Sequence, residues 1–295
     1  MNLLSKFEAI QVAANIRVSE TDKYFCEAHQ RAYEAALSCF HELEYIWEDI
    51  SDRQKALLSG VETGYAAYLY SEGNIDISTD KISEHIKELH GKFLRNLVNY
   101  FNSTYHITID CYAAEEMFLP QIPSNKRRDE DTLKKYEGEM LNLILRYEDI
   151  VNFIFTKMDG RGFDEQAFHE LHEKCHAAAW NINQKKANFE VKKNILQFSY
   201  GCSYSSFYSS SRWSLTDHVK DVLRGIAHYE TGVYGTYPSG FEQLLGYRCT
   251  ADLFEFPTSQ KVKQLKMFKN NRVDIKFASE HHVRQFCDKY LGLVC

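Results

Sequence analysis

Residues 263–277 read KQLKMFKNNRVDIKF, and this stretch decides the fold of the C-terminal part. Polar and apolar residues alternate on both sides of Asn270 and Asn271, and asparagine tolerates the positive φ that a tight turn needs. The pattern predicts a β-hairpin. The segment from Ser279 to Leu291 then predicts a last helix that covers one face of the hairpin. Its inward residues are expected to be Val283, Phe286 and Tyr290.

Upstream of the hairpin, helical and strand patterns follow one another. Asp164 is a good N-cap for a helix that runs to about Trp180. Residues 189–198 are rich in β-branched and aromatic side chains, which favours a strand or hairpin. Another helix is expected after Ser214, with Leu215, Val219, Val222 and Ile226 facing inward. Residues 161–295 are therefore predicted to form an α+β domain.

The first 160 residues predict mainly helices. Apolar residues recur there every three or four positions in three segments. The stripes are Phe25, Ala28, Ala32, Ala36, Cys39, Leu43 and Ile46; Ile82, Ile86, Leu89, Phe93, Leu97 and Tyr100; and Leu133, Tyr136, Met140, Ile144, Tyr147, Val151, Ile154 and Met158. We expect the second helix to start near Ser78 or Thr79 and the third to be continuous, ending at the two glycines of 159–162.

Two interruptions separate these helices. Residues 105–109 are β-prone and favour a short strand, whereas 120–131 contains two prolines and a charged run and predicts an exposed loop. The predicted fold class is α+β and predominantly helical, with a helical domain at 1–160 and a smaller α+β domain at 161–295. Because no Gly/Ser linker separates them, the two domains are expected to share an interface.

Composition and charge exclude several classes of protein. With 44% hydrophobic and 26% charged residues, the chain has a globular composition, and no stretch approaches the ~18 apolar residues of a membrane span. The eight cysteines form no CxxC pair, and the N-terminal residues lack a secretory pattern, so we expect reduced thiols and a cytoplasmic location.

The net charge of −6 is unevenly divided along the chain. Residues 1–160 hold 27 Asp+Glu against 17 Lys+Arg (−10), while 161–295 hold 14 against 18 (+4). The acidic N-terminal part would repel a phosphate backbone, whereas the C-terminal part could approach one. The alternative is that both surfaces are simply solvated.

Residues 172–176 read HEKCH, which has the HExxH form of zinc peptidases. His172 and His176 would share one helix face and one Zn²⁺, and Glu173 would be the catalytic base that deprotonates the bound water. The charged Lys174 is unusual for such a buried helix, and a distant residue such as Glu230 would have to supply the third ligand. The alternative interpretation is a polar surface stripe beside a buried cysteine.

The segment 200–213 holds six serines and five aromatic residues. Tyrosine and serine together are typical of recognition surfaces, and aromatic rings near positive charge stack on bases. The candidate binding residues here are Tyr204, Phe207, Tyr208, Arg212 and Trp213. The alternative is a loop whose rings fold back onto the core.

A basic run in the C-terminal hairpin is the other candidate for a binding surface. Its members are Lys261, Lys263, Lys266, Lys269, Arg272 and Lys276, with Asp274 the sole acidic residue of the run. Alternation along the strands predicts that these charges line one solvent-exposed face and position a phosphate backbone. The alternative is that the lysines protect an edge strand from pairing with another chain.

The hairpin also carries a family resemblance. Residues 266–277, KMFKNNRVDIKF, resemble the closing signature of the bacterial and phage family named domain of unknown function 4942. In that family an aromatic-Lys-Asn-Gly turn leads to a strand ending in Phe and a final helix, whereas this chain has Asn271 in place of the glycine. The resemblance implies a phage or mobile-element context, often beside a DNA methyltransferase, and supplies no catalytic residue.

Known catalytic signatures are otherwise missing from the sequence, which contains no Walker A, GxGxxG or GxSxG motif. We therefore expect a cytoplasmic, non-enzymatic interaction module without a cofactor, binding a protein or nucleic-acid partner in a DNA-modification or anti-defence context. The alternative from a different class is a zinc-dependent hydrolase that uses His172, Glu173 and His176.

Overall fold

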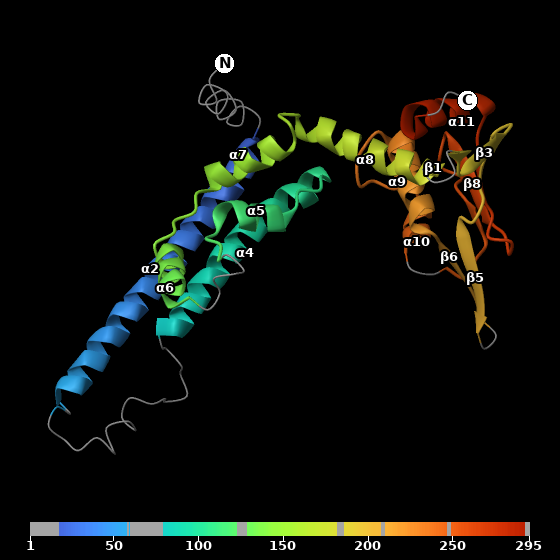
Figure 1. The fold of residues 1–295 in the computed structure, drawn as a ribbon. Helices are drawn as coiled ribbons and strands as arrows, with labels where there is room; N and C mark the ends of the chain where they lie inside the picture. Colours follow the sequence, from blue (N-terminus) through green and yellow to red (C-terminus); the bar gives the residue numbers. More distant parts are fainter. Residues whose placement is uncertain are drawn as a thin grey trace. The chain divides into compact units, whose positions relative to one another are not determined.

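A computed structural model describes residues 18–57, 59, 79–122, 129–181, 186–207, 210–246 and 249–292 (Figure 1). The chain forms two compact units: unit 1 comprises Met1–Thr104 and Thr108–Gly162, and unit 2 comprises Tyr105–Ile107 and Phe163–Cys295. The described elements are mostly helical with a smaller share of strand, which confirms the predicted α+β, mostly helical class. No helix within the described ranges is long and apolar enough to cross a membrane.

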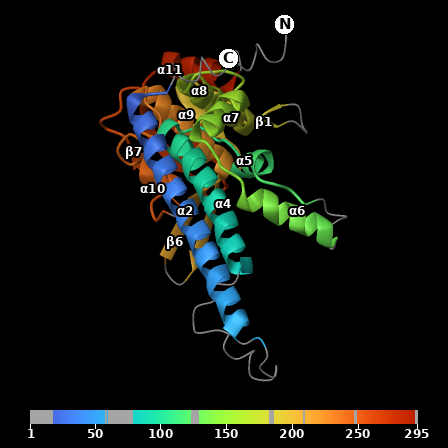
Figure 2. The ribbon, with the colours of Figure 1, turned by 90° about the vertical axis from the view of Figure 1, so that its left-hand side faces the viewer.

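Unit 1 is built on two long antiparallel helices. Its elements are α2 (Glu20–Leu57), α4 (Thr79–Tyr105), α5 (Cys111–Phe118), α6 (Glu130–Leu141) and α7 (Tyr147–Lys157). Helices α2 and α4 lie side by side in both views (Figures 1 and 2), joined by stacked rings at Phe25–Tyr100 (3.7 Å) and Tyr33–Phe93 (4.4 Å). The predicted start of α4 at Thr79 is confirmed, as are the buried positions Ile82, Ile86, Phe93 and Leu97.

The predicted apolar stripe of α2 is wrong in its phase. Ala32, Cys39, Leu43 and Ile46 are exposed, and the buried residues are instead Asp22, Cys26, Tyr33 and Leu37. The buried face of α2 contains both polar and apolar residues. A prediction that counts only apolar residues therefore assigns the adjacent face of the helix to the core. The buried polar groups are paired: Asp22 Oδ1 accepts a hydrogen bond from Tyr100 Oη at 2.8 Å.

The predicted continuous helix through 133–158 is also wrong, because the chain leaves the helix at 142–146. Side chains of α2 satisfy the backbone there. Leu145 N donates to the Tyr33 hydroxyl (3.2 Å), Gln30 Nε2 donates to Leu145 O (2.9 Å), and Tyr147 N donates to Gln30 Oε1 (2.9 Å). Ile144, assigned by its spacing to the buried stripe, is 67% exposed.

The β-prone segment 105–109 forms no strand. Asn102 takes the place of a strand partner, since its side chain accepts from Ile109 N (2.8 Å) and donates to Ile109 O (2.9 Å). The predicted loop at 120–131 ends earlier than expected, because Glu130 and Asp131 begin α6; residues 123–128 lie outside the described residues. The predicted helix end after 158 is confirmed, with Asp159 and Gly160 at positive φ.

Unit 2 combines helices with antiparallel strands. The helices are α8 (Phe163–Ala179), α9 (Asp217–Thr231), α10 (Phe241–Leu245), α11 (Glu280–Phe286) and the π-helical turn η2 (Cys287–Leu291). The strands are β1 (Trp180–Asn181), β2 (Lys186–Ala187), β3 (Phe189–Lys192), β4 (Ile195–Phe198), β5 (Cys202–Phe207), β6 (Ser210–Leu215), β7 (Leu253–Glu255), β8 (Val262–Met267) and β9 (Val273–Phe277). Five strands form one sheet in the order β3-β4-β9-β8-β7, while β1 pairs with β2 and β5 with β6.

One face of the five-stranded sheet packs against helices and forms the core of unit 2 with them. Its inward residues belong to one cluster with those of α8, α9, α11 and η2, among them Cys175, Val222, Ile226, Phe286 and Tyr290. The sheet contributes Leu196, Phe198, Val262, Leu265, Met267, Val273, Ile275 and Phe277. The strand prediction for 189–198, the C-terminal hairpin with Asn271 at φ 65°, and the last helix with Val283 inward are all confirmed.

The segment 200–213 is not a loop, since it forms the hairpin β5–β6 with Tyr204 paired opposite Trp213. Alternating side chains place Trp213 in the core (5% exposed), where its backbone also bridges Cys249. Leu215, expected inside the following helix, is buried as the last residue of β6.

Candidate nucleic-acid interface

Lys266 and Lys276 of the basic run lie on the outer face of the five-stranded sheet, together with acidic residues from neighbouring strands. One row across the strands reads Glu190, Gln197, Asp274, Lys266 and Leu253. The next reads Lys192, Ile195, Lys276, Gln264 and Glu255. The first row holds two carboxylates and one lysine and the second holds two lysines and one carboxylate, so the charges cancel over the two rows together. The basic character of the run therefore does not extend over the sheet face, and it concentrates at the β8–β9 turn.

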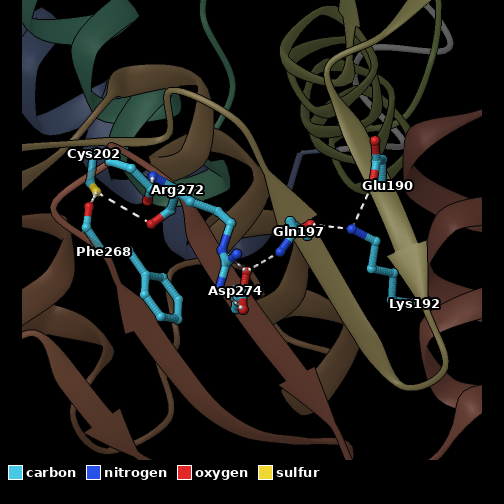
Figure 3. A network of polar contacts seen from close by, with 8 residues as sticks. Glu190, Lys192, Gln197, Cys202, Phe268, Arg272 and Asp274 are labelled. Carbon is cyan, nitrogen blue, oxygen red and sulfur yellow. Dashed lines mark hydrogen bonds and ion pairs between the residues drawn. The ribbon is translucent and has the colours of Figure 1, made fainter.

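A polar network crosses the sheet beside that turn (Figure 3). Lys192 Nζ lies 2.9 Å from Glu190 and donates to Gln197 at 2.8 Å, and Gln197 Nε2 donates to Asp274 at 2.7 Å. Arg272 Nη2 donates to Asp274 Oδ2 at 3.3 Å; its Nε lies 3.1 Å from Oδ1, as an ion-pair contact without hydrogen-bond alignment. Asp274 thus neutralises Arg272 and orients its guanidinium.

The β8–β9 turn is held against the start of β5. Gly201 N donates to Asn271 O (2.7 Å). Figure 3 shows the Cys202 thiol, which donates to the carbonyls of Phe268 (3.6 Å) and Arg272 (3.5 Å). Burial raises the pKa of the Cys202 thiol, which keeps the proton that it donates. A Cβ at position 201 would lie 2.8 Å from Val273 Cγ2, so only glycine permits this approach.

This anchoring brings the two predicted binding segments together. Lys269 Nζ lies 5.1 Å from the centre of the Tyr204 ring, and the Phe268 ring is covered by Lys266 (5.2 Å) and Arg272 (4.0 Å). We call these five residues the turn cluster: Tyr204, Lys266, Phe268, Lys269 and Arg272. Lys266 and Lys269 are exposed, and no ion pair involves either of them within the described part of the chain.

The other residues of the basic run lie apart from the turn cluster. Lys276 is exposed at the far end of β9, and Lys263 is exposed with its ammonium donating to Ser259 O. Lys261 lies over the Tyr229 ring at 4.4 Å and donates to Tyr229 O, which ties it to α9.

Of the remaining aromatic-segment residues, Arg212 is exposed on β6 and Trp213 belongs to the core. The Phe207 side chain and Tyr208 lie outside the described residues. Phe268, which was not among the predicted site residues, joins the turn cluster. Its place just after the alternating run of β8 is the signal that could have identified it.

The HExxH residues lie on the partly exposed side of α8. The rings of His172 and His176 are nearly parallel with centroids 6.3 Å apart, and Glu173 Oε1 lies 3.3 Å from His169 Nε2. Cys175, between them, is fully buried. Within the described ranges no group of three His, Cys, Asp or Glu residues could hold a metal ion. Glu230, the candidate third ligand, instead accepts hydrogen bonds from the backbone at the start of β8.

These positions lead to a test of the zinc alternative. We expect purified protein to hold far less than one equivalent of zinc, and the metal content to be unchanged by His172→Ala, because the half-buried His172 and the exposed His176 bind the ion weakly without a third ligand. Metal analysis by mass spectrometry measures this, with Lys174→Ala as a control on the same helix. About one equivalent of zinc, lost in His172→Ala, would make the hydrolase the leading function.

Comparison with protein families, curated proteins and solved structures finds no match to this chain. The likeness of 266–277 to domain of unknown function 4942 therefore stays a prediction from the sequence.

Proposed function

We propose that unit 2 is a non-enzymatic module that binds single-stranded nucleic acid through the turn cluster. The observation that carries this proposal is the convergence of Tyr204 with Lys269, which come from segments far apart in the sequence. A phosphate backbone needs cations without fixed acidic partners, and Lys266 and Lys269 meet that condition among the described residues.

The aromatic rings of the turn cluster are the reason why we expect single strands to bind more tightly than duplexes. An exposed lysine over a ring contributes about 0.5–1 kcal/mol, whereas a base stacked on an aromatic ring contributes about 1–3 kcal/mol. An unpaired base is therefore expected to displace Lys269 from Tyr204 and free its ammonium for the adjacent phosphate. In a duplex the bases are already stacked on one another, so the ring has little to add.

We also propose a cellular location and a biological context for this function. The seven cysteines that the structure describes are free thiols, which supports a reducing, cytoplasmic location. The C-terminal resemblance to a phage and mobile-element family supports an accessory role in DNA modification or anti-defence, and favours nucleic acid over protein as the partner.

A binding titration tests the proposal. With a labelled single-stranded oligonucleotide at low salt, we expect a Kd of roughly 10 µM and a salt slope that reflects about three to five phosphate contacts. The double variant Lys266→Glu/Lys269→Glu should weaken binding at least about ten-fold. Tyr204→Ala should weaken single-strand binding about five-fold and duplex binding much less.

The control is Lys134→Glu/Lys135→Glu, which makes the same change in net charge at two exposed lysines of α6. It should leave binding nearly unchanged. If neither single strands nor duplexes bind, or if both double variants weaken binding equally, the turn cluster is not a nucleic-acid site.

A further inference from the structure

Unit 2 contains a cavity of about 270 Å³ that the turn cluster does not include. Its walls come from α8, α9 and the loop 233–237, and residues 106–107 close one side. A water molecule occupies ~30 Å³ in the liquid, so the space would hold about nine waters or one small organic molecule. The volume lies just below the usual range for small-ligand sites, ~300–1,000 Å³.

The guanidinium of Arg224 is the group of the cavity that favours an anion. Lys174 and Arg224 line it together with one acidic residue, Glu170. Arg224 Nη1 lies 2.5 Å from Asp221 Oδ1, and across the described residues this is its one ion pair. A guanidinium has five N–H donors in a planar fork, so donors remain for a planar carboxylate.

His228 adds a neutral donor to the same wall. Its Nδ1 lies 2.9 Å from the hydroxyl of Tyr290, and within the described part of the chain this buried hydroxyl contacts no other acceptor. The hydroxyl therefore donates to Nδ1, and the ring proton sits on Nε2. Burial, followed by the nearby Lys289 charge, lowers the pKa of His228, which keeps the imidazole neutral at pH 7.

Flat and apolar surfaces complete the site. The rings of His228 and Tyr234 stack at 4.2 Å with 16° between their planes, and Ile107, Leu171 and Val233 line the cavity with them. His106 has a strained left-handed backbone at φ 56°, whereas Gly235 beside it adopts φ 68° without strain. A Cβ on Gly235 would lie 2.5 Å from His106 Cε1. Such strain persists only where the surroundings enforce it, and it clusters at ligand sites.

We propose that this cavity binds a small aromatic carboxylate, with its ring against the His228–Tyr234 pair and its carboxylate on Arg224 and His228 Nε2. The planar ring matches the stacked wall, and the carboxylate matches the guanidinium donors that remain on Arg224 beside its ion pair with Asp221. An aromatic cation would place a positive charge beside Arg224, and a simple inorganic anion would leave the apolar wall uncovered.

Benzoate is the probe, titrated into the full-length protein by calorimetry. For a ligand of this size we expect a Kd of about 1 mM. Benzamidine, which has the same ring and the opposite charge, should bind at least about ten-fold more weakly. Inorganic phosphate should not compete, and cyclohexanecarboxylate, which lacks the planar ring, should be about three-fold weaker.

Two variants separate binding from folding. Arg224→Gln should weaken benzoate about ten-fold, while Arg284→Gln, which breaks a similar intrahelical ion pair with Glu280 on α11, should have no effect. Thr236→Trp changes an exposed lining residue and should block binding while leaving the thermal midpoint unchanged. The proposal is overturned if benzoate fails to bind, if benzamidine binds as well, or if Arg224→Gln binds like the wild type.

Discussion

Replacing Glu230 with alanine is expected to lower the free energy of unfolding of unit 2 by about 2–4 kcal/mol. Glu230 lies at the C-terminal end of α9, and its carboxylate accepts from three successive backbone amides: Gln260, Lys261 (2.8 Å) and Val262 (3.1 Å). Hydrogen bonds to a charged group contribute about 1.5–3 kcal/mol each, and part of this is recovered when water reaches the freed amides. The loss should appear as a lower urea midpoint.

The matched control is Glu190→Ala. Glu190 is also a unit 2 carboxylate, but it forms an exposed ion pair with Lys192, which is worth about 0–1 kcal/mol. In Glu230→Ala, hydrogen exchange should speed up at the amides of Lys261 and Val262 before it does so in β9. Equal midpoints for the two variants would show that the carboxylate does not hold the start of β8.

The C-terminal hairpin could be predicted because its information is local. Alternation on both sides of Asn270 and Asn271 predicts strand direction and the register from Gln264 to Lys276, and Asn271 does adopt the positive φ that the turn needs. The alternation does not predict the register shift between Val262 and Gln264. The same counting along the chain predicted a basic sheet face. Glu190 and Glu255 lie on the same face, but they belong to β3 and β7. A count of charges within the hairpin alone does not include them.

The other predictions from the sequence were wrong or incomplete because they depend on contacts between residues far apart in the chain. Apolar periodicity assigned Ala32 and Ile46 to the inward face of α2, whereas the structure buries Asp22 and Tyr33 beside groups that pair with them. The role of Glu230 depends on amides thirty residues further on, so its sequence context suggested only a distant ligand. The turn cluster has the same origin, since Tyr204 meets Lys269 only after both hairpins have formed.

The second large effect is expected at Tyr33, which links three parts of unit 1. Its buried hydroxyl accepts from Leu145 N (3.2 Å) and lies 3.0 Å from His90 Nδ1, while His90 Nε2 lies 3.0 Å from Met140 O. A carbonyl oxygen only accepts, so Nε2 carries the ring proton, and the hydroxyl donates to Nδ1 at 3.0 Å in preference to Leu143 O at 3.5 Å. Burial lowers the pKa of His90, which favours this neutral form. The three contacts form one directed chain of hydrogen bonds.

Tyr33→Phe removes the middle of that chain without opening a large cavity. The amide of Leu145 and Nδ1 of His90 are then left buried without this partner, and an unsatisfied buried polar group costs about 1–3 kcal/mol. We therefore expect the free energy of unfolding of unit 1 to fall by about 2–4 kcal/mol, measured by urea denaturation. Tyr45→Phe, on the same helix but 73% exposed, should change it by less than about 0.5 kcal/mol. Hydrogen exchange at the Leu145 amide should accelerate most, because the non-helical segment 142–146 depends on the Tyr33 hydroxyl. If the two variants lose similar free energies of unfolding, apolar packing and not the hydroxyl holds that segment.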